Sequence, residues 1–224
     1  MTTLPRRETR RLGQTDRIVD AAQRLLYAEG DSFTIQGLVE EAGCALQTFY
    51  RHFPSKDHLL LAVLAKTISR SCAELEEATR SMKNPIDRLH FYVTAPLHRL
   101  AEGDTHSAQA TTHEHFRLHQ LFPQEVAQAT RPFATIVLAS LEHASARGLA
   151  GTDDPAADAQ TITRLVMTTF HYYAFSTGGD LIDEAEKLWQ FVARAIIVSQ
   201  TSDVAVATRA RASATRVSVR RAGR

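Results

Sequence analysis

Residues 45–52 carry a cluster of side chains whose types and spacing suit contact with duplex DNA. The Gln47 amide can pair with adenine in the major groove, and the methyl group of Thr48 can contact the methyl group of thymine. Tyr50 and His52 have polar atoms suited to phosphate oxygens, which position a protein on DNA without reading its sequence. We therefore predict DNA contacts from Thr34, Ala45, Leu46, Gln47, Thr48, Tyr50, Arg51, His52 and Lys56.

A helix-turn-helix unit is expected to position these side chains. Thr34 is a good N-cap for a short helix that Gly43 ends, and a second short helix then runs to Phe53. Phe49 lies four residues before Phe53, so both rings share the face that packs against the preceding helices. In helix-turn-helix proteins the second helix enters the major groove. The spacing therefore predicts that residues 45–52 form a recognition helix.

The rest of the chain is predicted to be helical. Glycine and proline are scarce, at 10 and 7 residues, and no segment alternates convincingly with period two. Capping and stop residues divide the chain into about nine helices. Beyond the two short ones, we expect helices at 15–29, from Ser55 past Leu75, from Asn84 and Pro85, from Asp104 to about Gln120, from Pro123 to Arg147, from Asp154 and Pro155 to about Thr177, and from Asp183, with Glu186 completing its cap, to near Gln200.

Charge is distributed unevenly, although the formal net charge is only +1. Residues 201–224 hold six arginines against the single acidic residue Asp203, and residues 1–11 are also rich in arginine. Residues 1–60 hold eight Lys and Arg against eight Asp and Glu. DNA affinity should therefore come from a few placed donors and from the N-terminal arm rather than from bulk charge. For both basic ends, DNA contact and a merely solubilising role remain open alternatives.

Cysteine content and the lengths of apolar segments also indicate the cellular compartment. The two cysteines, Cys44 and Cys72, are too few for a disulfide framework. The longest clean apolar run, residues 59–65, is far shorter than the roughly 20 residues that a membrane span needs. No signal-peptide pattern follows the start of the chain. We expect a cytoplasmic protein without a membrane partner.

Residues 34–60 resemble the DNA-binding signature of the TetR family of bacterial transcriptional regulators. In that signature a Thr-capped helix runs into Ala-Gly-Val-Ser and then Thr-aromatic-Tyr-x-His-Phe-x-Ser-Lys-Glu-x-Leu. Three places depart from it: Ala45 replaces the capping serine, Cys44 replaces valine, and Asp57 with His58 replaces the acidic pair. The first departure implies that a serine–phosphate contact is missing. The matching positions are Thr34, Ala42, Gly43, Thr48, Phe49, Tyr50, His52, Phe53, Ser55, Lys56 and Leu59.

The resemblance implies an all-α chain with an N-terminal three-helix helix-turn-helix domain and a C-terminal helical domain that binds a ligand and dimerises. The expected parts are a flexible arginine-rich arm at 1–14, the DNA-binding domain at 15–60, the ligand-binding and dimerisation domain at 61–200, and a disordered basic tail at 201–224.

Apolar stripes on the last two long helices are expected to form a homodimer interface. They present more apolar surface than one isolated helix pair needs, and in proteins similar to this one the corresponding pair forms a four-helix interface. The residues assigned to it are Ile162, Leu165, Val166, Phe170, Tyr173, Leu188, Phe191, Val192, Ala195 and Ile196.

A ligand pocket is expected in the C-terminal domain from the resemblance alone. The residues assigned to it are Phe91, His113, Phe116, Met167, His171 and Trp189. His115 and His119 are spaced four apart, which can chelate a metal, but no cysteine lies nearby and Glu114 falls on another face. Polar lining of a cavity and plain surface histidine are the competing interpretations. We expect neither a metal nor another cofactor.

These observations favour a DNA-binding transcriptional regulator rather than an enzyme. The resemblance implies a homodimeric repressor that binds a pseudo-palindromic operator and is released by an unidentified small-molecule inducer. One alternative is an all-helical, histidine-rich, metal-dependent enzyme, which would leave residues 34–60 unexplained. Another is a TetR-like activator or nucleoid-binding protein, which would keep the fold but change its role.

Overall fold

The computed structural model describes residues 6–103, 105–176 and 178–197, with side chains from Gly13 onward. The all-α prediction is confirmed for these residues, whose only extended pairing is an isolated bridge between Ala150 and Ile197. The elements are α1 (Arg6–Glu29), η1 (Gly30–Ser32), α2 (Ile35–Glu41), α3 (Leu46–His52), α4 (Lys56–Thr79), α5 (Pro85–Glu102), α6 (Thr105–Leu121), α7 (Pro123–Ala146), α8 (Pro155–Phe175) and α9 (Leu181–Ile196).

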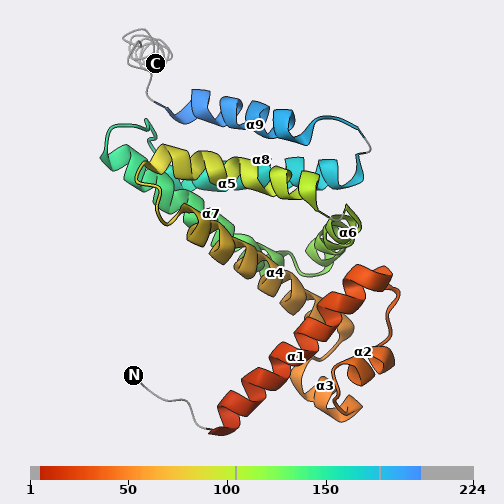
Figure 1. Cartoon of the computed structure of the whole chain (residues 1–224). Helices are drawn as coiled ribbons and strands as arrows, with labels where there is room; N and C mark the ends of the chain where they lie inside the picture. The colour runs from red at the N-terminus through yellow and green to blue at the C-terminus, as the bar shows by residue number, and fades with distance from the viewer. Residues whose placement is uncertain (1–5, 104, 177, 198–224) are drawn as a thin grey trace, which may run out of the picture.

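The helices form two parts joined by α4 (Figure 1). One part, which we call the N-terminal domain, consists of α1, η1, α2, α3 and the first turns of α4. The other part, which we call the helical body, contains α5, α7, α8 and α9, with α4 running on alongside α7. Helix α6 lies between the two parts and packs against α1, α4, α7 and α8. A change in the position of α6 would therefore alter contacts with both parts of the chain.

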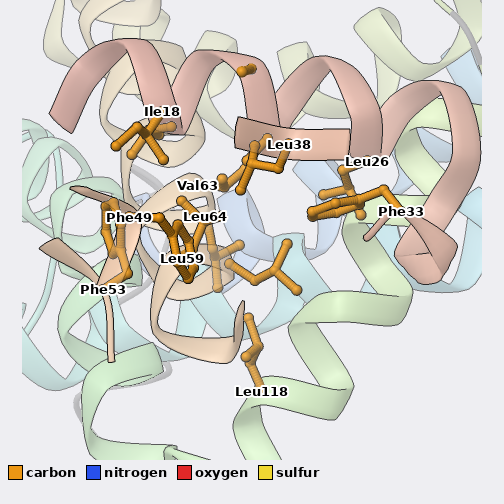
Figure 2. Packing of buried hydrophobic residues seen from close by; sticks show 14 of the residues in the cluster. Ile18, Leu26, Phe33, Leu38, Phe49, Phe53, Leu59, Val63, Leu64 and Leu118 are labelled. Carbon is orange, nitrogen blue, oxygen red and sulfur yellow. The ribbon is translucent and has the colours of Figure 1, made fainter. Parts of the chain in front are cut away.

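A single apolar cluster holds the N-terminal domain together (Figure 2). Ile18 of α1, Phe49 of α3 and Leu59 of α4 are fully buried at its centre. Leu118 of α6 joins the same cluster and is also fully buried. Burying such side chains stabilises the fold by roughly 1.5–3 kcal/mol each. The core of the N-terminal domain thus includes a residue from α6.

A second cluster forms the core of the helical body. Leu89 of α5, Val137 of α7 and Val166 of α8 are fully buried in it, and Val192 of α9 is nearly so. Helix α9 packs chiefly along α5 and touches α8 much less. None of the helices in the described segments combines the length and apolar character that crossing a bilayer requires.

Local capping follows the sequence closely. The Thr34 hydroxyl accepts a hydrogen bond from the Gly37 amide at 3.1 Å, and the Ser55 hydroxyl accepts one from His58. Asn84 and Asp154 cap α5 and α8 in the same way. These four caps were predicted from the sequence and are confirmed, because an N-cap depends only on residues within a few positions of it.

Two boundary predictions are wrong. Helix α1 begins at Arg6, so residues 6–14 are helical rather than a flexible arm. Helix α9 begins after Asp180, whose carboxylate accepts from the amides of Ile182 and Asp183, so Asp183 lies in the first turn instead of capping it. The competing cap lay only three residues upstream and was equally suitable. The predicted cap Asp104 and the tail at 201–224 lie outside the described residues.

Candidate nucleic-acid interface and internal cavity

Helix α3 presents one face to the core and the other outward. Phe49 is fully buried and Phe53 nearly so, and their ring centroids lie 6.0 Å apart. On the outward side Leu46 is 44% exposed and Tyr50 is 52% exposed. The Tyr50 ring also meets the Phe49 ring edge-on at 5.1 Å, which fixes its orientation. The two buried phenylalanines therefore determine which residues of α3 face outward.

The outward face carries most of the residues predicted to touch DNA. Gln47 and Arg51 are exposed, and Thr48 is partly exposed. Ala45 is the N-cap of α3 and provides no side-chain hydrogen bond, in keeping with the missing serine. Thr34 is exposed, and because its oxygen accepts from Gly37, its hydroxyl proton remains available to a phosphate.

Two of the predicted phosphate contacts have partners inside the domain. The Lys56 ammonium donates to the carbonyl of Phe33 at 2.8 Å and to the carbonyl of Asp31, and it lies 4.1 Å from the Phe33 ring centroid. Partial burial lowers the pKa of Lys56. His52 Nδ1 lies 2.9 Å from the Thr15 hydroxyl of α1. Lys56 therefore links η1 to α4, a role that a pattern of residue types does not reveal, and its contact with a phosphate stays a prediction.

A charged link joins α6 to the start of α4. The Arg117 guanidinium donates to Asp57 Oδ1 at 2.8 Å and to Glu114 Oε2 at 2.7 and 3.0 Å. These bonds raise the pKa of Arg117 above its ordinary value. Glu114 is only 3% exposed, and the Arg117 guanidinium is the counter-charge that its buried carboxylate contacts. Nothing in the sequence indicates a pairing across 60 residues, and the link was not predicted.

An internal cavity of about 330 Å³ lies where α4, α5, α6, α7 and α8 meet, with Tyr27 of α1 at its edge. Pockets for small molecules start at roughly this size. Its wall is mainly apolar, with Leu64, Ile68 and Phe133 among the lining residues. Pro96, which also lines it, lacks the amide needed to continue the hydrogen-bond ladder of α5.

The cavity only partly matches the predicted pocket. Met167 and His171 line it, whereas Phe91, Phe116 and Trp189 do not. Phe116 is 55% exposed, and Trp189 packs edge-on against His90 at 5.0 Å. Phe91 packs against the core of the helical body. The assignment of these three aromatic residues is corrected, because residue type alone cannot tell a core ring from a pocket ring.

His113 is also misassigned, and His115 was missed as a pocket residue. The His113 side chain is exposed and lies 3.4 Å from Glu114 Oε1, away from the cavity. His115 lines the cavity, and its ring centroid lies 4.7 Å from that of His171. Burial lowers the pKa of His115 and, more strongly, that of His171 to about 4. Both imidazoles are therefore neutral at pH 7.

The dimer assignment also needs correction. Ile162, Val166, Val192 and Ile196 are buried in the core of their own protomer, so they are not available to a second copy. Phe170 lines the cavity. Leu165, Tyr173 and Leu188 are partly exposed, and Ala195 is exposed. The most exposed large apolar side chains of α8, α9 and their connection are Tyr172, Phe175, Ile182 and Phe191, of which the sequence prediction included only the last.

The histidines do not form the predicted alternative metal centre. His115 and His119 stack with nearly parallel rings, centroids 6.4 Å apart, so their nitrogens do not converge as two ligands of one ion would. A different trio, Asp31, His113 and Glu114, has donor atoms within 4.8 Å of one another. Two of the three are exposed, and the carboxylate of Glu114 already binds Arg117.

Comparison with known proteins places the helix-turn-helix in a family. Residues 18–63 match the model of the bacterial regulatory proteins of the tetR family. The chain is 33% identical over 78 residues to the HTH-type transcriptional repressor KstR of Mycobacterium tuberculosis, which is 34% of this chain and 36% of that protein. It is 30% identical over 97 residues to KstR of Rhodococcus jostii, 43% of this chain and 44% of that protein. The match thus spans less than half of these relatives.

Solved structures resemble the whole fold. A TetR-family transcriptional regulator from Pectobacterium atrosepticum has a TM-score of 0.71 at 15% identity, covering 88% of this chain and 99% of that one. FadR from Bacillus subtilis in complex with stearoyl-CoA has a TM-score of 0.63 at 18% identity, covering 79% and 96%. At these identities the likeness concerns the fold alone. Together with the N-terminal match, it confirms the resemblance that the sequence predicted: residues 18–63 match the DNA-binding part of the tetR family of bacterial regulatory proteins, and the fold is that of TetR-family regulators.

Proposed function

We propose that the chain is a transcriptional repressor that binds a pseudo-palindromic operator as a homodimer and is released by a small molecule. The observation that carries the proposal is the outward face of α3, where exposed Gln47, Tyr50 and Arg51 stand on a helix fixed by buried Phe49. Such a helix can enter the major groove without moving the core. The match of residues 18–63 to this family supports regulation rather than catalysis.

Release by a ligand has a physical route through α6. The same helix lines the cavity with Thr111 and His115 and, one turn later, contacts the N-terminal domain through Arg117 and Leu118. A molecule that favours another position of α6 would therefore change how α4 and α3 are held. Because such coupling is a population shift, the ligand must prefer the conformation that does not bind DNA.

Dimerisation is supported by the exposed aromatic surface of α8 and α9. Tyr172 is 66% exposed, and Phe175 and Phe191 are 55% and 56% exposed. Large apolar side chains exposed together on one surface mark interaction sites in proteins that are otherwise well packed, and we propose that these three lie on such a surface. A second copy related by a twofold axis would cover them and would present two recognition helices to the same side of a duplex.

The operator provides the direct test. Duplexes enriched from a random library by the full-length protein should share two inverted half-sites centred about 10 bp, or a multiple of this, apart. A footprint on genomic DNA should overlap a promoter. Enrichment without any consensus would contradict sequence-specific binding and favour a nucleoid-binding protein. A footprint confined to the region upstream of the polymerase site would favour an activator.

Replacing Phe191 by glutamate should dissociate the dimer. A carboxylate on this exposed ring position would lie against an apolar surface of the partner and would lose hydration without a counter-charge. Sedimentation velocity should show a monomer for this variant over a concentration range in which the wild type is dimeric. Leu121 of α6 is similarly exposed, at 53%, and its replacement by glutamate is the matched control that should stay dimeric. A dimeric F191E protein would exclude this surface.

A further inference from the structure

His171 has an unusual environment at one end of the cavity. It is 91% buried, and its Nδ1 atom lies 2.9 Å from the hydroxyl of fully buried Thr112. Its Nε2 atom is buried and has no hydrogen-bond partner in the described part of the chain. A buried polar atom left in this condition costs roughly 1–3 kcal/mol. The cavity wall thus contains a buried polar atom that no protein group among the described residues satisfies.

A second imidazole lines the same cavity next to His171. His115 lines the cavity beside His171, with ring centroids 4.7 Å apart, and the structure gives neither of its nitrogens a hydrogen bond within the described residues. Two imidazoles on one wall match a head group with two oxygens better than a single hydroxyl. Outside this pair the lining contains leucine, isoleucine, phenylalanine and methionine side chains together with several threonine and serine hydroxyl groups. The site therefore combines a pair of imidazoles with a wall that is partly apolar and partly lined by hydroxyl groups.

The other ionisable groups at the cavity decide the charge of the head group. Arg99 donates to Glu74 at 3.1 Å, which offsets its charge, and burial raises the pKa of the Cys72 thiol to about 11, so the thiol is neutral. The Tyr27 hydroxyl accepts from Gln23 at 3.0 Å. Exposed His119 stacks behind His115. No carboxylate lines the cavity among the described residues, so an amine would find no counter-charge there.

We propose that the cavity binds an amphipathic carboxylic acid, with its carboxyl group against His171 and His115 and its apolar body in the remainder of the cavity. This rests on the proposed function, because it names the chemical class of the releasing ligand. Binding forms a carboxylate–imidazolium pair: the His171 imidazole takes up one proton from solvent, so that both ring nitrogens carry a hydrogen, and no other bond forms or breaks. The pair as a whole is neutral, so no net charge is buried.

Proton uptake gives this binding a defined pH dependence. Above about pH 6 a free carboxylic acid is ionised, and burial holds the pKa of His171 near 4, so its imidazole is neutral before the acid binds. The complex then holds one more proton than its separated components. The association constant should therefore fall about tenfold for each unit of pH increase, up to the pKa that His171 has in the complex.

The test uses full-length protein and three probes with the same chain: decanoic acid, decan-1-ol and decylamine. Isothermal titration in two buffers of different ionisation enthalpy should give uptake of about one proton for the acid and none for the alcohol. The acid should bind more tightly than the other two probes at pH 6.5. Equal affinity for the acid and the alcohol, absence of binding by the acid, or absence of proton uptake would overturn the proposal.

Variants of the cavity residues test which side chain causes the preference for the acid and the proton uptake. H171Q keeps an amide at the site but cannot titrate, so it should bind decan-1-ol as the wild type does and lose proton uptake with the acid. H171L should lose the preference for the acid as well. H119L, at the exposed ring behind His115, is the matched control and should behave as the wild type. If R99M lost the preference for the acid and H171L kept it, the carboxylate would bind Arg99, and the assignment of the carboxyl group to His171 would be refuted.

A mobility shift with each preparation separates this inference from the proposed function. Operator binding by H171Q and H171L shows that the variants are folded. If decanoic acid binds with proton uptake but the protein remains on DNA, the proposed ligand class is supported and the proposed release from DNA by that ligand is refuted. If the wild type binds its operator but shows no preference for the acid, the repressor stands and the ligand class fails.

Discussion

The double replacement of Gln47 and Tyr50 by alanine should lower operator affinity by about 100-fold while leaving the dimer intact. A base contact from a well-placed glutamine contributes about 1–3 kcal/mol of discrimination, and each 1.4 kcal/mol is about a factor of ten. Both side chains are exposed on α3 and neither belongs to the hydrophobic core, so the domain should remain folded. Mobility shift on the selected operator measures the loss, and sedimentation checks the assembly.

The two single variants should differ in kind. Q47A should relax specificity at one base pair of each half-site, whereas Y50A should weaken binding to all sequences by a similar factor. Gln120, exposed near the end of α6, gives the matched control, since Q120A removes the same amide away from the recognition helix. Undiminished operator affinity in the double variant would refute the assignment of α3 as the recognition helix.

Replacing Arg117 by methionine should destabilise the protein by about 3 kcal/mol and weaken the communication between cavity and DNA. The variant leaves Glu114, which is 3% exposed, without the guanidinium that binds its Oε2 atom, and it removes the 2.8 Å bond to Asp57. The cost is placed at the low end for a broken buried pair because the Arg117 side chain is 30% exposed. Urea denaturation measures the stability, and operator release by ligand measures the coupling.

Two controls make this result specific. R117M combined with E114Q should regain part of the stability, because the buried charge is then removed together with its partner. R24M breaks the exposed pair with Glu41, whose two side chains are 59% and 43% exposed, and should cost well under about 1 kcal/mol. If the R117M protein were as stable as the wild type and were released from the operator as readily, the Arg117 link would contribute neither to stability nor to the coupling between the cavity and DNA binding.

Most of the local structure could be predicted because its causes are local. The caps at Thr34, Ser55, Asn84 and Asp154 each depend on a side chain and an amide two or three residues away. The outward face of α3 follows from two phenylalanines four residues apart, which must share the buried side of a helix. Where two equivalent caps compete, as at Asp180 and Asp183, the sequence prediction fails.

The sites depend on partners far apart in the chain. His171 meets Thr112 and His115 because α6 crosses α8, and Lys56 reaches the Asp31 carbonyl because η1 lies against the start of α4. Residue types at these positions are compatible with many roles: the spacing of His115 and His119 suggested a metal, and Lys56 suggested a phosphate contact. Only the interatomic distances place His115 and His171 on a cavity wall and show that Lys56 links η1 to α4.

The amino-acid sequence by itself thus determined helix α3, including its length, its buried face and the residues that it presents outward, since helical periodicity and capping act over a few residues. The tertiary structure decided which apolar stripes remain on the surface. Helix α9 packs along α5, and this covers Val192 and Ile196 while leaving Phe191 exposed. An amphipathic pattern specifies that a face will be buried, but the neighbouring helix that buries it is selected by the packing of the whole chain.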